Sequence, residues 1–139
     1  MDTTADTQTT IWPCLAFDDA RAMIHFLTTA FDFEATAVYA RDNDDSVIEH
    51  GELRRPGGGG IMFGSTGRDD SPFGTRPPGV ANLYLVVDNP DALYAKAKAA
   101  GATIIRELRD EDYGSRGFSA ADPEGNLWSF GTYRGEGPS

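Results

Sequence analysis

The chain has 139 residues, 40% of them hydrophobic, a length that corresponds to one domain or to two small fused modules. Its 22 acidic and 12 basic residues give a formal net charge of −10, which disfavours binding to nucleic-acid phosphates or anionic membranes. A single cysteine excludes an internal disulfide, and no apolar run is long enough to span a bilayer. These features predict a cytoplasmic protein.

The first half of the sequence predicts a strand, a helix and three further strands. Apolar residues 11–17 are typical of a strand. Asp18 and Asp19 then supply an N-cap for a helix over 20–31, whose apolar positions recur at helical spacing. Three strand-like segments follow, at 35–41, 46–54 and 60–64. The glycine run at 57–60 predicts a flexible hairpin turn between the last two.

The second half repeats this order about 70 residues later, as expected for an internal duplication. Residues 80–87 read as a strand, and Asn89 caps a helix over 91–100 that has Pro90 at its first position. Gly101 is suited to end that helix in a left-handed conformation. Three more strand-like segments follow, at 103–108, 117–121 and 126–133.

The repeat predicts an α+β fold made of two βαβββ modules, whose strands form a curved, cup-shaped mixed sheet. The Gly-, Pro-, Asp- and Ser-rich stretch between the modules is expected to be a linker. The predicted divisions are a disordered tail at 1–10, modules at 11–64 and 80–134, a linker at 65–79 and a second tail at 135–139.

Alternation along each strand separates the side chains beneath the helices from those on the concave side of the sheet. In the first strand, Leu15 and Phe17 are expected beneath the helix, so Trp12 and Cys14 face the concave side. The same reasoning applies to the other strands. The side chains expected to line or approach the concave surface are Trp12, Cys14, His50, Glu52, Asn82, Tyr84, Ser129 and Tyr133.

Three segments resemble the vicinal oxygen chelate superfamily, which contains glyoxalases, bleomycin-resistance proteins and extradiol dioxygenases. Residues 122–131, with the sequence DPEGNLWSFG, resemble the turn and final strand of that family. Residues 87–93 together with 99–102 resemble its second-module helix, and 50–54 together with 61–64 are similar to glyoxalase-like members. The resemblance extends over about 11–133 and implies the two-module, cup-shaped fold of this superfamily.

The metal ligands that the resemblance implies are missing from this sequence. The family's ligand positions on the first strand of each module and on the last strand correspond to Trp12, Asn82 and Ser129. An indole cannot ligate a cation through a lone pair, and Asn and Ser are poor ligands for Zn, Ni or Fe. The chain has only His25 and His50, and helical spacing places His25 toward solvent. We therefore expect no metal and no other cofactor, which disfavours metal-dependent glyoxalase or dioxygenase activity.

Two further features are candidates for chemistry: the pair His50 and Glu52, and Cys14. His50 and Glu52 lie two apart on a predicted strand, where we expect them to share one face with Ile48. A histidine beside a carboxylate can act as a general base, and a hydrogen-bonded pair at the sheet surface is the simpler interpretation. Cys14 is expected to be buried and inert, because it lies in an apolar strand with no His or Lys beside it.

The leading hypothesis is a protein that binds a small molecule, cationic or aromatic, without a metal, as sequestration and antibiotic-resistance members of the superfamily do. Its ligand crevice is expected at a homodimer interface. The side chains expected to stack on the ligand are Trp12, Tyr84 and Tyr133, and those expected to orient it are Asn82, Ser129 and Glu52. The alternatives are a lyase or isomerase that uses His50 and Glu52, and an interaction module with a filled concavity.

Overall fold

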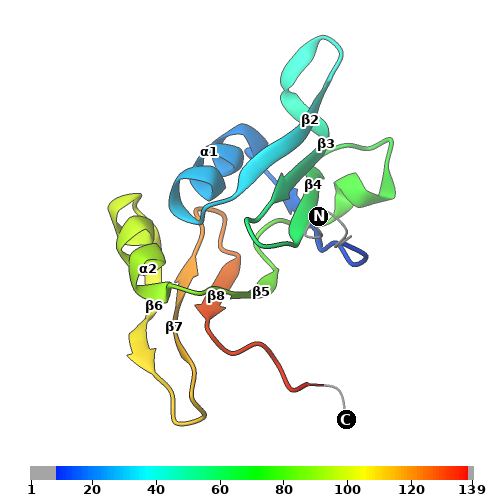
Figure 1. The fold of residues 1–139 in the computed structure, drawn as a ribbon. Helices are drawn as coiled ribbons and strands as arrows, with labels where there is room; N and C mark the ends of the chain where they lie inside the picture. The colour runs from blue at the N-terminus through cyan, green and yellow to red at the C-terminus, as the bar shows by residue number, and fades with distance from the viewer. Residues whose placement is uncertain (1–8, 138–139) are drawn as a thin grey trace.

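A computed structural model describes residues 9–137 as two four-stranded sheets with two α-helices packed on one side of them (Figure 1). The first module contains β1 (Cys14–Phe17), α1 (Ala20–Ala30), β2 (Glu34–Arg41), β3 (Asp44–Arg54) and β4 (Gly60–Ser65). Its strand order is β1-β4-β3-β2, with β1 parallel to β4 and the other pairs antiparallel.

The second module repeats this topology. It contains β5 (Asn82–Val86), α2 (Pro90–Ala99), β6 (Thr103–Asp110), β7 (Arg116–Ala121) and β8 (Leu127–Gly131). Its strand order is β5-β8-β7-β6, again with one parallel pair at the β5 edge. The predicted pair of βαβββ modules is therefore confirmed. Residues 1–8 and 138–139 of the predicted tails lie outside the described residues. No helix within 9–137 is long and apolar enough to cross a membrane.

The two modules share one hydrophobic core. Phe31, directly after α1, is fully buried and places its ring 4.8 Å from that of Phe130 and 5.6 Å from that of Trp128, centroid to centroid. Both partners lie on β8 of the other module. Edge-to-face and tilted aromatic pairs of this kind add to the stability gained from burial alone. The core therefore fixes the modules relative to each other.

The start of α1 is held by both modules. The side chain of Asp19 accepts a hydrogen bond of 3.0 Å from the backbone N–H of Ala22, as an N-cap does. Glu124, in the turn before β8, accepts bonds of 2.7 Å from the backbone N–H groups of Asp18 and Asp19. A carboxylate from the second module thus satisfies donors at the first helix's N-terminus, where negative charge is favourable.

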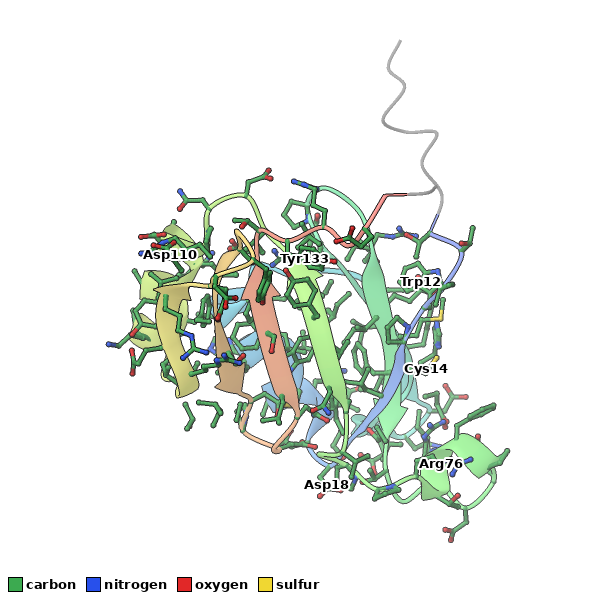
Figure 2. The ribbon with its side chains drawn as sticks, turned by 90° about the horizontal axis from the view of Figure 1, so that it is seen from below. Trp12, Cys14, Asp18, Arg76, Asp110 and Tyr133 are labelled. Carbon is green, nitrogen blue, oxygen red and sulfur yellow. The ribbon has the colours of Figure 1, made fainter. Side chains whose placement is uncertain are left out.

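The strands leave one face of the sheets free of helices. Figure 2 looks onto this open face, where β8, β5 and β1 lie side by side with α1 behind them. Cys14 is in register with Met62 of β4, and Met62 is in register with Glu52 of β3. Leu15 and Phe17 point to the opposite side and are buried. The open face of the first module therefore carries the polar and thiol side chains.

A register shift in β3 corrects the predicted faces of that strand. Tyr39 pairs with His50, but its neighbour Ala40 pairs with Ile48, which leaves Glu49 as an extra residue. Such a bulge reverses the alternation of side chains on either side of it. Ile48 is consequently fully buried in the core, so the prediction that it shares a face with His50 and Glu52 is wrong.

Candidate functional site

The eight predicted site residues divide between the two sheets. Trp12, Cys14, His50 and Glu52 belong to the first module, and Asn82, Tyr84, Ser129 and Tyr133 belong to the second. Cys14, Asn82 and Tyr84 meet at a shallow hollow of about 460 Å³ between β1 and β5. The remaining five residues do not line this hollow, so the structure does not gather the predicted set into one site.

A second cavity, of about 260 Å³, lies on the open face of the first module and is covered by the linker after β4; we call it the β4 pocket. Strands β1, β3 and β4 form its floor, and residues of the linker form its cover. The side chains and glycine that matter to its chemistry are Cys14, Glu49, His50, Met62, Gly64, Arg68, Phe73 and Arg76. Its volume is slightly below the range of about 300–1,000 Å³ that is typical of small-molecule pockets.

Arg68 is the buried polar group of the β4 pocket, with 8% of its surface exposed. Its Nε donates a 2.7 Å hydrogen bond to the carbonyl of Ser65, and its Nη1 donates a 3.3 Å bond to the carbonyl of Glu49. Nη2 has no hydrogen-bond partner within residues 9–137. It lies against the Cα of Gly64, where a Cβ would be 2.5 Å from it. A glycine in β4 therefore lets the guanidinium lie directly on the strand.

The linker folds back on itself to hold Arg68 in place. The N–H of Gly67 donates to the carbonyl of Gly74 at 2.9 Å, and the N–H of Ser71 donates to the carbonyl of Arg68 at 3.3 Å. A Cβ on Gly74 would lie 2.4 Å from the Arg68 carbonyl oxygen, so the two segments approach as closely as glycine allows. In Figure 2 the segment that carries Arg76 lies beside β1, near Asp18.

Arg68, Phe73 and Arg76 were not predicted from the sequence, because the composition of 65–79 indicated only a connector. The structure instead places a single-turn 3₁₀ helix, Pro72–Thr75, within it. The available signal was the pair of glycines at 64 and 74, which flank a basic residue in an otherwise acidic half of the chain.

His50 and Glu52 form the hydrogen-bonded pair that their spacing predicts. His50 Nε2 lies 2.8 Å from a carboxylate oxygen of Glu52, and their side chains are 41% and 26% exposed. His50 lines the β4 pocket, whereas Glu52 is outside its lining. Tyr39 stacks on the imidazole with ring centroids 6.4 Å apart. The arrangement orients the imidazole at the pocket wall.

The prediction of a buried Cys14 is wrong. Cys14 is exposed, and its thiol donates a weak bond of 3.6 Å to the carbonyl of Trp12. The buried apolar residues of β1, Leu15 and Phe17, are those facing α1. Cys14 lies on the open face, where it lines both the β4 pocket and the hollow beside β5. Trp12 precedes β1 and packs beneath the guanidinium of Arg54, 4.6 Å from the ring centroid.

In the second module, three of the four predicted side chains, those of Tyr84, Ser129 and Tyr133, make hydrogen bonds to other groups of the chain. The hydroxyls of Ser119 and Ser129 are 2.7 Å apart, and Tyr84 donates a 2.7 Å bond to the carbonyl of Tyr133. A hydrogen bond to Glu136, with lesser effects from burial and from neighbouring tyrosines, raises the pKa of Tyr133. Tyr113 meets Tyr133 edge-to-face, with centroids 5.7 Å apart. The hydroxyl groups of Tyr84, Ser129 and Tyr133 thus already have hydrogen-bond partners within the chain.

The most distinctive sequence motif, at 122–126, has a structural role. One oxygen of the Asp122 carboxylate accepts bonds from the N–H groups of Glu124 and Asn126, and the other accepts from the Asn126 amide and the Trp128 indole. The Asn126 amide oxygen in turn accepts from the N–H of Ala81, just before β5. The motif thus joins the start of β5 to that of β8.

Comparison with known families agrees with this architecture. The model of the glyoxalase/bleomycin resistance protein/dioxygenase superfamily matches residues 9–130. The chain belongs to this superfamily. The superfamily resemblance drawn from the sequence is therefore confirmed. Because members share a fold but differ in activity, membership by itself assigns no reaction.

Individual relatives of this superfamily member are similar over most of their length. The uncharacterised protein Rv0887c of Mycobacterium tuberculosis is 32% identical over 126 residues, which cover 86% of this chain and 71% of the relative. Among solved structures, TioX from Micromonospora sp. ML1 matches with a TM-score of 0.75 and 26% identity, covering 89% of this chain and 98% of that one. A superfamily protein from Burkholderia phytofirmans PsJN matches with a TM-score of 0.65 and 22% identity, covering 86% and 94% of the two chains, which shows the fold alone.

The metal that the superfamily implies does not fit the residues present. The implied ligand positions hold Trp12, Asn82 and Ser129, none of which is a good ligand for Zn, Ni or Fe. His50 and Glu52 provide two donors, and no group of three His, Cys, Asp or Glu side chains comes together within residues 9–137.

Proposed function

We propose that this superfamily member binds a small organic molecule in the β4 pocket through its own side chains, without a resident metal. The observation that carries the proposal is the largely buried side chain of Arg68, whose Nη2 makes no hydrogen bond within residues 9–137 and is still accessible to solvent, in a cavity that Met62 and Phe73 also line. Ligand pockets typically combine apolar walls with a few fixed polar groups. Phe73 is 71% exposed on the cover of this pocket, so it offers a ring face to a planar ligand.

The proposal keeps part of the ligand set predicted from the sequence. Cys14 and His50 line the β4 pocket, while Asn82 and Tyr84 line the neighbouring hollow across β1. The proposed roles of Trp12, Tyr84 and Tyr133 in stacking stay predictions, because Trp12 already lies against Arg54 and the two tyrosines bond to each other. A ligand longer than the β4 pocket would extend over Cys14 toward Asn82.

A sequestration or resistance role in the cytoplasm, carried out by a homodimer, is part of this proposal. The open face of the second module supports pairing, because apolar side chains there are unusually exposed. The exposed fractions are 48% for Tyr84, 39% for Val86, 42% for Leu127 and 37% for Tyr133. Light scattering after size-exclusion chromatography should give twice the chain mass of 15.0 kDa, and a monomer at all concentrations would contradict the dimer.

Binding is tested with three naphthalene compounds of similar shape: neutral 2-naphthamide, anionic 2-naphthoate and cationic 2-naphthylmethylammonium. Metal-stripped protein should bind at least one of them saturably, with an affinity unchanged by EDTA or added zinc. Phe73→Ala should weaken that binding, whereas Ile105→Ala, which removes an exposed apolar side chain from β6, should leave it unchanged. Binding of none of the three, or binding that requires added metal, would contradict the proposal.

A second candidate function is a lyase or isomerase in which His50 moves a proton. The favouring observation is the 2.8 Å contact between His50 Nε2 and Glu52, which fixes the imidazole so that Nδ1 is left to exchange a proton with a bound molecule. If the chain turns over any ligand found for the β4 pocket, His50→Ala and Glu52→Ala should each lower kcat. Unchanged turnover in both variants would remove this candidate.

A further inference from the structure

We infer that the β4 pocket selects small molecules that carry an anionic oxygen group, such as a carboxylate, beside an apolar body. This inference rests on the proposed binding function and names its ligand class. The inference depends on the position of Arg68 in the pocket. The negative net charge of the whole chain gives no indication of this local positive group. The groups that surround the guanidinium decide which charge a ligand should carry.

The Arg68 guanidinium is fixed on one edge and free on the other. Nε and Nη1 are held by the carbonyls of Ser65 and Glu49, at 2.7 and 3.3 Å, so the plane of the group is set before any ligand arrives. Nη2 has no partner within residues 9–137 and lies over Gly64 on the pocket floor. Nη2 is still accessible to water, since no buried side-chain nitrogen or oxygen within these residues lacks a partner. A ligand oxygen that replaces this water accepts a charge-assisted hydrogen bond from Nη2.

The carboxylate nearest to Arg68 is that of Glu49, which already forms an ion pair with Arg41. Glu49 lies 3.7 Å from Arg68 Nη1, but it makes a closer, 2.6 Å contact with the Nε of Arg41. That hydrogen bond is the main cause of the raised pKa of Arg41. Arg41 also reaches Asp70 at 3.3 Å. The carboxylates of Glu49 and Asp70 therefore pair mainly with Arg41, which leaves Arg68 available to a ligand.

A second arginine adds to the positive charge of the pocket. Arg76 lines the cavity, is exposed, and its guanidinium makes no hydrogen bond or ion pair within residues 9–137. The formally charged side chains that line the pocket are therefore two arginines, Arg68 and Arg76, and one carboxylate, Glu49. The pocket is locally positive on a chain whose formal net charge is −10. Charges farther away than about 10 Å are largely screened at ordinary ionic strength, so the local charges govern a bound ligand.

The apolar part of the ligand follows from the remaining walls. Met62 and Phe73 line the pocket together with Arg68, and the space available is about 260 Å³. Thioether and aromatic groups adapt to flat apolar surfaces. The fit is to a one- or two-ring acid and not to a free inorganic anion, because an ion alone would leave these walls uncovered.

The discriminating experiment compares 2-naphthoate with 2-naphthamide by titration calorimetry at pH 7.5. The two probes have nearly the same shape and differ in charge. We expect 2-naphthoate to bind at least about tenfold more tightly, the ratio typical of one hydrogen bond to a charged group. Arg68→Gln should abolish this preference, and Arg68→Lys should restore part of it. Arg21→Gln, which removes the same charge from an exposed site on α1, should keep the preference.

The variant Gly64→Ala keeps the charge of Arg68 but moves its guanidinium, so it tests the position of the charge separately from its presence. In Gly64→Ala, the new Cβ would meet Nη2 at 2.5 Å and the central guanidinium carbon at 2.9 Å, so the guanidinium must leave the pocket floor. We expect the preference for 2-naphthoate to fall in this variant as in Arg68→Gln. This variant and the comparison on the wild-type chain test the inference even if Arg68→Gln does not fold.

Failure of the inference and failure of the proposed function give different results. Equal affinity for 2-naphthoate and 2-naphthamide, or a preference that survives both Arg68→Gln and Gly64→Ala, would overturn the anion selectivity and leave small-molecule binding in place. Tighter binding of 2-naphthylmethylammonium would do the same and would favour the cationic ligand expected from the net charge. Binding of none of the three probes would overturn both.

Discussion

The indole Nε1 of Trp128 donates a 2.9 Å hydrogen bond to the carboxylate of Asp122, six residues earlier in the chain. Both residues are buried, with 0% and 5% of their surfaces exposed. The bond joins the turn before β8 to the largest side chain of the core. A motif that identifies the superfamily in the sequence therefore acts by organising the second module and its contact with Phe31.

Asp122→Ala should destabilise the fold strongly. The substitution leaves four hydrogen-bond donors without their acceptor, the indole of Trp128 among them. We expect a loss of about 3–5 kcal/mol in the free energy of unfolding, as for other broken buried networks. Equilibrium urea denaturation measures it, with Asp112→Ala as an exposed control that should change stability little. A loss for Asp122→Ala no larger than that of the control would contradict the structural role of the motif.

Glu124→Ala should loosen the first turn of α1, although the two lie more than 100 residues apart. The variant removes the carboxylate that accepts from the N–H groups of Asp18 and Asp19. We expect a loss of about 1–2 kcal/mol, comparable to the loss of a good N-cap. Hydrogen exchange should accelerate at the amides of Asp18 and Asp19, while Glu34→Ala, on exposed β2, should leave them unchanged. Unaltered exchange in Glu124→Ala would show that the modules are not coupled through this contact.

Phe31→Ala should weaken both modules together. The ring contacts Phe130 and Trp128 across the module boundary and Phe26 within α1. Truncating a fully buried phenylalanine should reduce the free energy of unfolding by about 3–5 kcal/mol. Unfolding followed by tryptophan fluorescence and by far-ultraviolet circular dichroism should still coincide. Two separate transitions would indicate that the modules fold independently.

The ion pair between Asp91 and Arg116 should make stability depend on pH. Arg116 donates 2.8 and 3.0 Å bonds to the two oxygens of Asp91, in the first turn of α2, and these bonds are the main cause of the lowered pKa of Asp91. A carboxyl with a depressed folded-state pKa stabilises the fold above its unfolded-state pKa and loses that effect as the pH falls through the folded-state value.

Comparison of thermal midpoints for the wild type and Asp91→Asn tests this ion pair. The variant should be slightly less stable at pH 7, and the difference should shrink on acidification below about pH 4, the ordinary range of an aspartate. Asp112→Asn is the control with no such pattern. A difference between wild type and Asp91→Asn that stays constant from pH 7 to acid would contradict the assignment.

The sequence predicted the fold well because its signals are local. The caps at Asp19 and Asn89, the apolar alternation in β1 and β5 and the glycine turns each act within a few residues. Their repetition in the two halves then indicated the duplicated topology. The buried and open faces of β1 and β8 follow directly from period-two alternation.

The candidate site was less predictable because it depends on contacts between distant segments. The bulge at Glu49 moves Ile48 to the core, and no residue type in that stretch marks it. Arg68 becomes a buried binding group only because the linker folds over Gly64, a close approach that composition does not reveal. The exposure of Cys14 likewise depends on what covers β1 and not on the apolar residues around it.

Ligand binding in the β4 pocket is tested most directly by an NMR titration of ¹⁵N-labelled, metal-stripped protein with 2-naphthoate. Binding there predicts saturable shifts concentrated at the amides of Met62, Gly64 and Arg68, and a weaker apparent affinity for 2-naphthoate in Gly64→Ala. Shifts centred instead on Tyr84 and Ser129 of the second module, with Gly64 unaffected, would contradict it.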